Sequence, residues 1–238
     1  MAISLGSPSY KLNIYPALIY RLLIVFMLFA ACRLFFFIYN QEYYTDIDFG
    51  RLALIFWGGL RFDLTALLYL NAVYLLIQII PFKIRHNQVY QQVAKWVFVF
   101  TNAVGIIMNI ADTVYYQITL KRTTAALFQQ FAHEVNLPGL VFRFLIEYWY
   151  VDLLAVSFIV LLIYLYNKIE VKPAPNQNIW KYTGLQFVFM AVTVYLTIVG
   201  IRGGFKHSTR PITLSNASAY ISICEPLGAT AQSPTYGS

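Results

Sequence analysis

The chain has 238 residues, of which 59% are hydrophobic, 18% aromatic and only 11% charged, and its formal net charge is +7. Soluble domains carry about 25% charged residues, so this composition excludes an ordinary water-soluble domain and indicates an integral membrane protein. The basic balance fits cytoplasmic loops and contacts with anionic lipid, since the chain carries no nucleic-acid-binding motif. Two cysteines imply neither a disulfide framework nor a cysteine-type metal site.

Five apolar segments follow one another along the chain, each close to the roughly 20 residues that a helix needs to cross a bilayer. They predict an all-α membrane domain over residues 17–201, a polytopic bundle of five transmembrane helices. The predicted spans cover residues 17–39, 60–80, 94–116, 142–166 and 180–201. An amphipathic helix over about 119–136 is expected to lie in the plane of the membrane interface.

The second apolar stretch, residues 52–80, is too long for one straight span. It contains the glycine pair and charges of residues 58–63, which predict an interruption there. Residues 52–59 are then an interfacial or tilted entry, and residues 64–80 are the deep part of the span.

Charged residues inside the spans are expected to have partners, because each costs at least about 2.5 to 3.5 kcal/mol to insert. The pair Arg61 and Asp63, together with Asp112, are the clearest cases. Arg21 and Arg33 lie near the two ends of the first span, where long basic side chains are expected to snorkel to the interface.

Polar residues recur at helical spacing in three spans, which predicts three helices that face one another. The three stripes are Asp63, Asn71, Tyr74 and Gln78; Thr101, Gly105, Asn109 and Asp112; and Tyr182, Gln186, Thr193, Thr197 and Gly200. The alternative is that these side chains only hold the bundle together through interhelical hydrogen bonds of about 0.6 kcal/mol each.

The distribution of basic residues predicts the orientation in the membrane. Residues 81–95 and 167–181 each hold three Lys or Arg, whereas residues 40–50 hold none. The positive-inside rule therefore places residues 1–16 in the cytoplasm and residues 202–238 outside, as a short extracytoplasmic tail.

Several basic residues fall on the predicted outer side, against this rule. They are Lys121, Arg122, Arg202, Lys206 and Arg210. Such residues are candidates for binding an anion there, such as a phosphate headgroup, and the alternative is that they meet headgroups without selecting any.

Catalytic constellations are missing from the sequence. His86, His133 and His207 are scattered, and no group of His, Cys, Asp or Glu has the spacing of metal ligands. The sequence therefore gives no catalytic residue and no metal ligand in this chain.

Three sets of motifs nevertheless occur in a characteristic order along the spans. They are Gly59-Leu60-Arg61-Phe62-Asp63; Asp112-Thr113-Val114-Tyr115-Tyr116 with Lys121-Arg122; and Arg202-Gly203-Gly204 with Arg210-Pro211-Ile212. Over about residues 17–220, the chain resembles the membrane region of the lipoteichoic acid synthase-like, or phosphoglycerol transferase, group of the alkaline phosphatase and sulfatase superfamily. The resemblance implies a five-helix bundle in the bacterial plasma membrane, followed by an extracytoplasmic domain with a Thr nucleophile and a divalent metal such as Mn, Mg or Zn.

Only 37 residues follow Ile201 here, fewer than the hundred or more of a usual domain. We therefore expect a membrane anchor truncated before the catalytic domain of an enzyme that acts on phosphate or sulfate esters of lipid-linked or cell-envelope substrates. Its expected partners are anionic lipid headgroups and, in the full-length parent, the catalytic domain. The residues expected to hold a headgroup or dock that domain are Arg61, Asp63, Asp112, Lys121, Arg122, Arg202 and Arg210. The alternatives are a small transporter or channel and a scaffold subunit.

Overall fold

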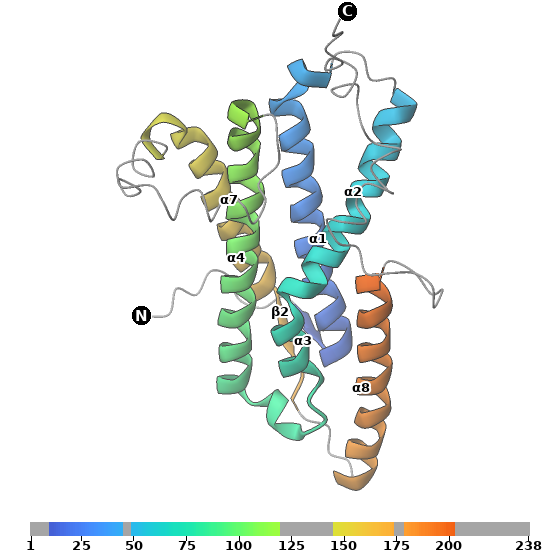
Figure 1. The fold of residues 1–238 in the computed structure, drawn as a ribbon. Coiled ribbons are helices and arrows are strands. Elements are labelled where there is room, and N and C mark those ends of the chain that lie inside the picture. Colours follow the sequence, from blue (N-terminus) through green and yellow to red (C-terminus); the bar gives the residue numbers. More distant parts are fainter. Residues whose placement is uncertain (1–9, 45–48, 120–144, 174–178, 203–238) are drawn as a thin grey trace, which may run out of the picture.

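The computed structural model of the chain describes residues 10–44, 49–119, 145–173 and 179–202 (Figure 1). These residues are mostly helical. The elements, in chain order, are β1 (Tyr10–Leu12), α1 (Ile14–Tyr39), η1 (Gln41–Tyr44), α2 (Phe49–Leu70), α3 (Ala72–Ile79), η2 (Lys83–His86), α4 (Gln88–Thr119), α7 (Trp149–Asn167), β2 (Ile169–Val171) and α8 (Ile179–Arg202). The predicted interfacial helix at 119–136 falls almost entirely outside the described residues.

Four helices of the described chain, α1, α4, α7 and α8, are long and apolar enough to cross a membrane. The bent pair Phe56–Leu70 and Ala72–Ile79 brings the number to five if the pair is one span. The helical, multi-pass character predicted from the sequence is thus confirmed.

The second apolar stretch bends at Asn71, not at residues 58–63 where the sequence predicts an interruption. α2 runs unbroken to Leu70, and α3 then turns away from it by 59°. The Asn71 side-chain amide donates to the Leu67 carbonyl at 3.0 Å and reaches across to another helix. The bend thus coincides with a buried asparagine that bonds both its own helix and α4.

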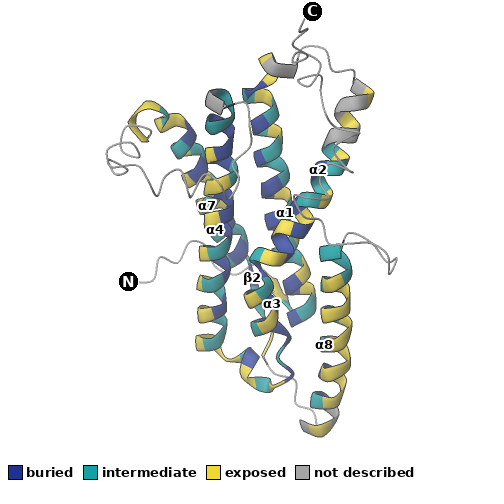
Figure 2. Cartoon of the chain, viewed as in Figure 1, coloured by how far each residue is buried: buried dark blue, intermediate teal, exposed yellow. Residues whose placement is uncertain are grey.

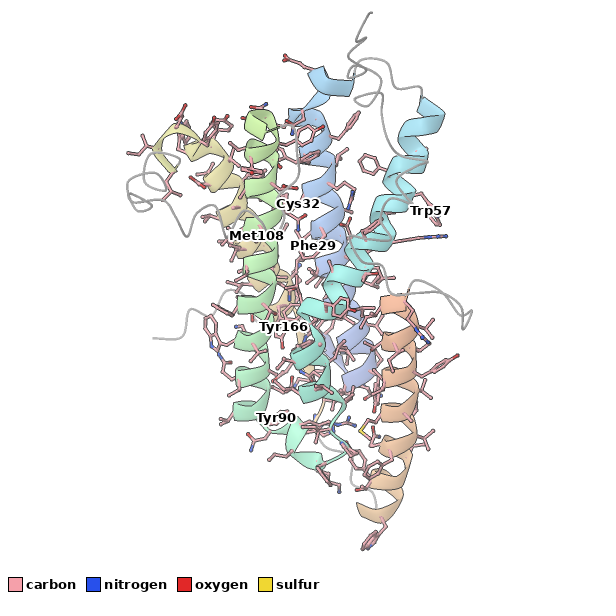
Figure 3. All side chains as sticks on the ribbon, in the orientation of Figure 1. Phe29, Cys32, Trp57, Tyr90, Met108 and Tyr166 are labelled. Carbon is pink, nitrogen blue, oxygen red and sulfur yellow. The ribbon has the colours of Figure 1, made fainter. Side chains whose placement is uncertain are left out.

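The helices pack around α1, which contacts α2, α4 and α7, while α8 lies against α2 and α3 at one edge (Figure 1). Side chains that point inward, including Phe29, Cys32 and Tyr166, are buried, whereas Trp57 projects outward (Figure 3). Most residues of α8 are exposed (Figure 2). An apolar helix with so little cover is typical of one that meets lipid on its outer face.

Two short strands fasten the chain at the end of the bundle that holds η2, which we call the η2 end. β1 pairs in parallel with β2, with Tyr10 opposite Ile169, and Lys11 lies 3.7 Å from Glu170. From the sequence, residues 1–16 are expected only as a cytoplasmic segment before the first span. This pairing ties the segment before α1 to the segment after α7.

The C-terminal part of α8 rests on α2 through a glycine. A Cβ added at Gly200 would lie 2.5 Å from the Leu68 side chain, whereas a Cβ added at Gly184 of the same helix would meet open space. Gly200→Leu is therefore expected to lower the free energy of unfolding by about 1 to 3 kcal/mol through overpacking. Gly184→Leu is the control, and equal destabilisation by the two variants in an unfolding titration would contradict this docking.

Candidate functional site

A buried ion pair joins α1 to α2 in the half of the bundle away from η2. Arg33 Nη2 lies 2.6 Å from Asp63 Oδ1, and Arg33 Nε donates to Asp63 Oδ2 at 2.9 Å. Arg33 Nη2 also donates to the Gly59 carbonyl at 3.1 Å. A Cβ at Gly59 would collide with the Arg33 guanidinium. Gly59 therefore makes room for the arginine within an unbroken helix.

The expected pairing of Arg61 with Asp63 is wrong, because Asp63 takes Arg33 as its partner. Residues two apart on a helix point in different directions, so Arg61 cannot share the inward face of Asp63. Arg61 is exposed. Arg33, expected to snorkel, is instead mostly buried in this pair, with 16% of its side chain exposed.

Arg202 ends α8 close to the level of this ion pair. Gly200 touches Leu68, and α2 and α8 run in opposite directions (Figure 1). Asp63 lies about 7.5 Å along α2 from Leu68, and Arg202 lies about 3 Å beyond Gly200. We call Arg33, Arg61, Asp63 and Arg202 the charged level, because they lie within about one and a half helical turns of one another in height.

The other predicted site residues are less closely associated with this level. Asp112 is buried on α4, beside Thr113, whose carbonyl accepts a hydrogen bond from Asn40 at 3.2 Å near the end of α1. The remaining predicted site residues, Lys121, Arg122 and Arg210, lie outside the described residues.

Two buried amides bond each other in the middle of the bundle. Asn71 and Asn102 each donate to the other at 2.8 Å, and both are fully buried. The predicted polar stripe of this helix includes Thr101 and not Asn102, but the Thr101 hydroxyl donates to the carbonyl of Val97 on its own helix. Asn102, Gly105 and Asn109 also share a helical face, so the same periodicity permits the correct choice.

A second polar group, which we call the η2-end cluster, links α1, α3, η2, α4 and α8. It consists of Tyr15, Arg21, Tyr74, Gln78, Arg85, Gln91, Tyr182 and Gln186. Its members confirm the inward placement of the predicted stripe residues Tyr74, Gln78, Tyr182 and Gln186.

Arg85 lies at the centre of this cluster, with only 1% of its surface exposed. Its Nε and Nη2 donate to Tyr182 Oη at 3.2 and 3.0 Å, and Nη2 also bonds Gln186 Oε1. Nη1 donates to Tyr15 Oη at 3.4 Å and to the Gln78 carbonyl at 3.3 Å. All of these acceptors are neutral.

Arg21 is the second buried guanidinium of the cluster, and the expectation that it snorkels is wrong. It is 3% exposed, and its guanidinium carbon lies 3.9 Å from the centre of the Tyr166 ring. Nη1 donates to Tyr74 Oη at 3.1 Å, and Nη2 donates to the Ile169 carbonyl at 3.2 Å. These acceptors are also neutral.

His86 borders the cluster and is held as a neutral imidazole. Tyr182 Oη already accepts from Arg85, so its own hydrogen goes to His86 Nε2 at 2.9 Å. His86 Nδ1 then donates to the Lys172 carbonyl at 2.8 Å. Burial, followed by the positive charges of Arg85 and Lys83, lowers the pKa of His86, although the bond to Lys172 acts in the opposite direction.

This arrangement predicts a loss of stability in mild acid. The unfolded chain binds a proton at His86 near its ordinary pKa of about 6.5, whereas the folded chain binds it only at lower pH. The free energy of unfolding is therefore expected to fall as the pH drops from above 6.5 through the lowered pKa. Melting curves of the wild type and of His86→Leu should differ in this window, and parallel curves would contradict the neutral state.

The chemistry available to the described residues is binding and orientation. Within the described ranges, no three His, Cys, Asp or Glu side chains gather as a metal site. The charged level and the η2-end cluster carry guanidiniums suited to holding anions. Neither offers an activated nucleophile.

Sequence reasoning missed three residues on which these sites depend: Arg33, Arg85 and Asn102. Arg85 was counted only as a basic loop residue. The sequence did carry a signal for Arg33. A cation within a membrane span needs a partner, as the Asp63 carboxylate does.

Comparisons with protein-family models, with curated proteins and with solved structures find no match for this chain.

Proposed function

We propose that the chain is the membrane-anchor region of an enzyme that acts on phosphate or sulfate esters at the outer face of the bacterial plasma membrane. Bond breaking belongs to an extracytoplasmic domain of the full-length parent, with its own divalent metal. The observation that supports the proposal best is the charged level, because the chain leaves α8 at Arg202, close in height to Arg61 and the Arg33–Asp63 pair. A domain that follows α8 would begin beside residues able to hold an anionic headgroup.

The proposed orientation has the η2 end in the cytoplasm. Lys83, Lys168 and Lys172 belong to segments that meet there, through the β1–β2 pair and the bond from His86 to the Lys172 carbonyl. Basic residues concentrate on the cytoplasmic side of membrane proteins, so this gathering supports the orientation. Arg202 then points toward the outer face.

The packing of the described residues in the middle of the bundle favours an anchor over a transporter. The reciprocal Asn71–Asn102 pair satisfies both amides, and Phe29 and Leu67 pack in the same core. A transporter needs a polar path that reaches both faces. The two polar sites instead lie on either side of this packed layer.

The proposal is tested by reading the genomic DNA beyond the codon for Ser238 in all frames and assaying the full-length protein. The double variant Arg61→Ala with Arg202→Ala is expected to lower turnover of a lipid-linked ester about fivefold. This corresponds to a loss of about 1 kcal/mol of binding free energy from exposed charges. Lys11→Ala with Lys172→Ala, two exposed lysines at the η2 end, is the control that removes the same number of charges. Unchanged turnover, or a downstream sequence without a Thr nucleophile and metal ligands, would favour the scaffold and transporter alternatives.

A further inference from the structure

The two paired strands β1 and β2, which we call the ribbon, present their charged side chains on one face. Lys11 lies opposite Glu170, and Lys172 lies two residues beyond Glu170, where its amide still pairs with the Leu12 carbonyl at 2.9 Å. Opposite residues of paired strands, and residues two apart along one strand, share a face. Ile169, on the other face, is buried, whereas Lys11 and Lys172 are exposed. The ribbon therefore turns a charged face away from the bundle.

Lysines outnumber carboxylates at the ribbon. Glu170 lies 3.7 Å from Lys11, and no carboxylate among the described residues pairs with Lys172. Lys168, whose carbonyl accepts from the Tyr10 amide at 3.3 Å, adds a third positive charge beside the strands. The other carboxylates of the described residues lie in the half of the bundle away from η2: Glu42, Asp63, Asp112, Glu147 and Asp152. Three lysines against one carboxylate give the ribbon a net positive charge.

The ribbon lies where two candidate membrane spans end. One residue separates β1 from the start of α1, and one residue separates the end of α7 from β2. Both helices are long and apolar enough to cross a membrane. Lys168 Nζ lies 5.0 Å from the ring of Tyr164, which is exposed on α7, and an exposed aromatic ring beside a lysine is typical of headgroup level. The lysines of the ribbon are thus within reach of the headgroups of one leaflet.

We propose that the ribbon binds anionic lipid headgroups through Lys11, Lys168 and Lys172, and that this binding stabilises the pairing of β1 with β2. Two short strands are marginally stable on their own, and like charges on one face oppose their pairing. Anionic headgroups offset this repulsion, and each lysine near an anionic surface strengthens binding about fivefold. The site lies at the opposite end from the charged level and is independent of the proposed enzyme activity. In the proposed orientation, the lipid belongs to the cytoplasmic leaflet.

Amide hydrogen exchange of the whole purified chain in nanodiscs tests the proposal. Discs of phosphatidylcholine alone are compared with discs that also contain phosphatidylglycerol. Exchange over residues 169–172 is expected to be about tenfold slower in the anionic discs. Lys11→Gln with Lys172→Gln leaves the backbone pairing in place and is expected to remove most of this difference. Glu170→Gln removes the carboxylate and is expected to enlarge the difference.

Arg61→Gln with Arg202→Gln is the charge-matched control, because it removes two positive charges at the opposite end, and it should keep the full difference. Polyglutamate added to the phosphatidylcholine discs distinguishes a lipid from an acidic polypeptide. The proposal is overturned if phosphatidylglycerol does not slow exchange in the wild type, since the lysines then serve orientation alone. It is also overturned if the double lysine variant keeps the full difference, if Glu170→Gln reduces it, or if polyglutamate slows exchange as much as the lipid does.

Discussion

Replacing Arg33 with Ala is expected to lower the free energy of unfolding by about 3 to 5 kcal/mol, because the variant leaves the Asp63 carboxylate buried without its cation. Arg33 Nη2 and Nε donate to the two Asp63 carboxylate oxygens at 2.6 and 2.9 Å, and Asp63 itself is buried. The loss also removes the bond to the Gly59 carbonyl. Unfolding by increasing SDS in mixed micelles measures the change.

Arg61→Ala is the matched control, since it removes the same charge two residues from Asp63. Arg61 is exposed, so the control is expected to change the free energy of unfolding by less than about 0.5 kcal/mol. The double variant Arg33→Leu with Asp63→Leu should recover much of the loss, because it leaves no unpaired charge. Equal effects of Arg33→Ala and Arg61→Ala would contradict the observed pairing.

The helical, multi-pass character was accessible from the sequence because the length of the apolar segments alone predicts it. The position of the bend could not be predicted from the sequence, because a pair of glycines is a stronger helix-breaking signal than a single asparagine. Gly59 has its role only once Arg33 of another helix is beside it. Asn71, at the bend, bonds both Leu67 and Asn102, and the second bond is a tertiary contact. Periodicity within one segment cannot supply such contacts.

The partners of the buried charges could not be predicted either, because they are also tertiary contacts. Arg61 and Asp63 are two residues apart in the sequence, yet a helix turns them apart, whereas Arg33 lies thirty residues away and meets Asp63 directly. Arg85 looked like an ordinary cytoplasmic loop residue. Its burial arises because η2 folds back under α1 and α8, where Tyr15 and Tyr182 provide acceptors.

Arg85→Ala is expected to lower the free energy of unfolding by about 3 kcal/mol, because several hydrogen bonds to a buried charged group are lost together. The effect should concentrate on α8. Among the described residues of this helix, Tyr182 and Gln186 are the buried ones. Both residues bind Arg85, so the variant removes the main polar attachment of the N-terminal part of α8. The Gly200 contact with Leu68 remains.

Spin labels at Gln92 and Leu185, which are both exposed, report on this attachment. The distance distribution between the labels is expected to broaden in Arg85→Ala and to stay narrow in Lys172→Ala, which removes the same charge from an exposed side chain at the same end. An unchanged distribution in Arg85→Ala would show that the apolar and glycine contacts hold α8 alone. A broadened one would mean that a buried cation fixes the helix that leads to the charged level.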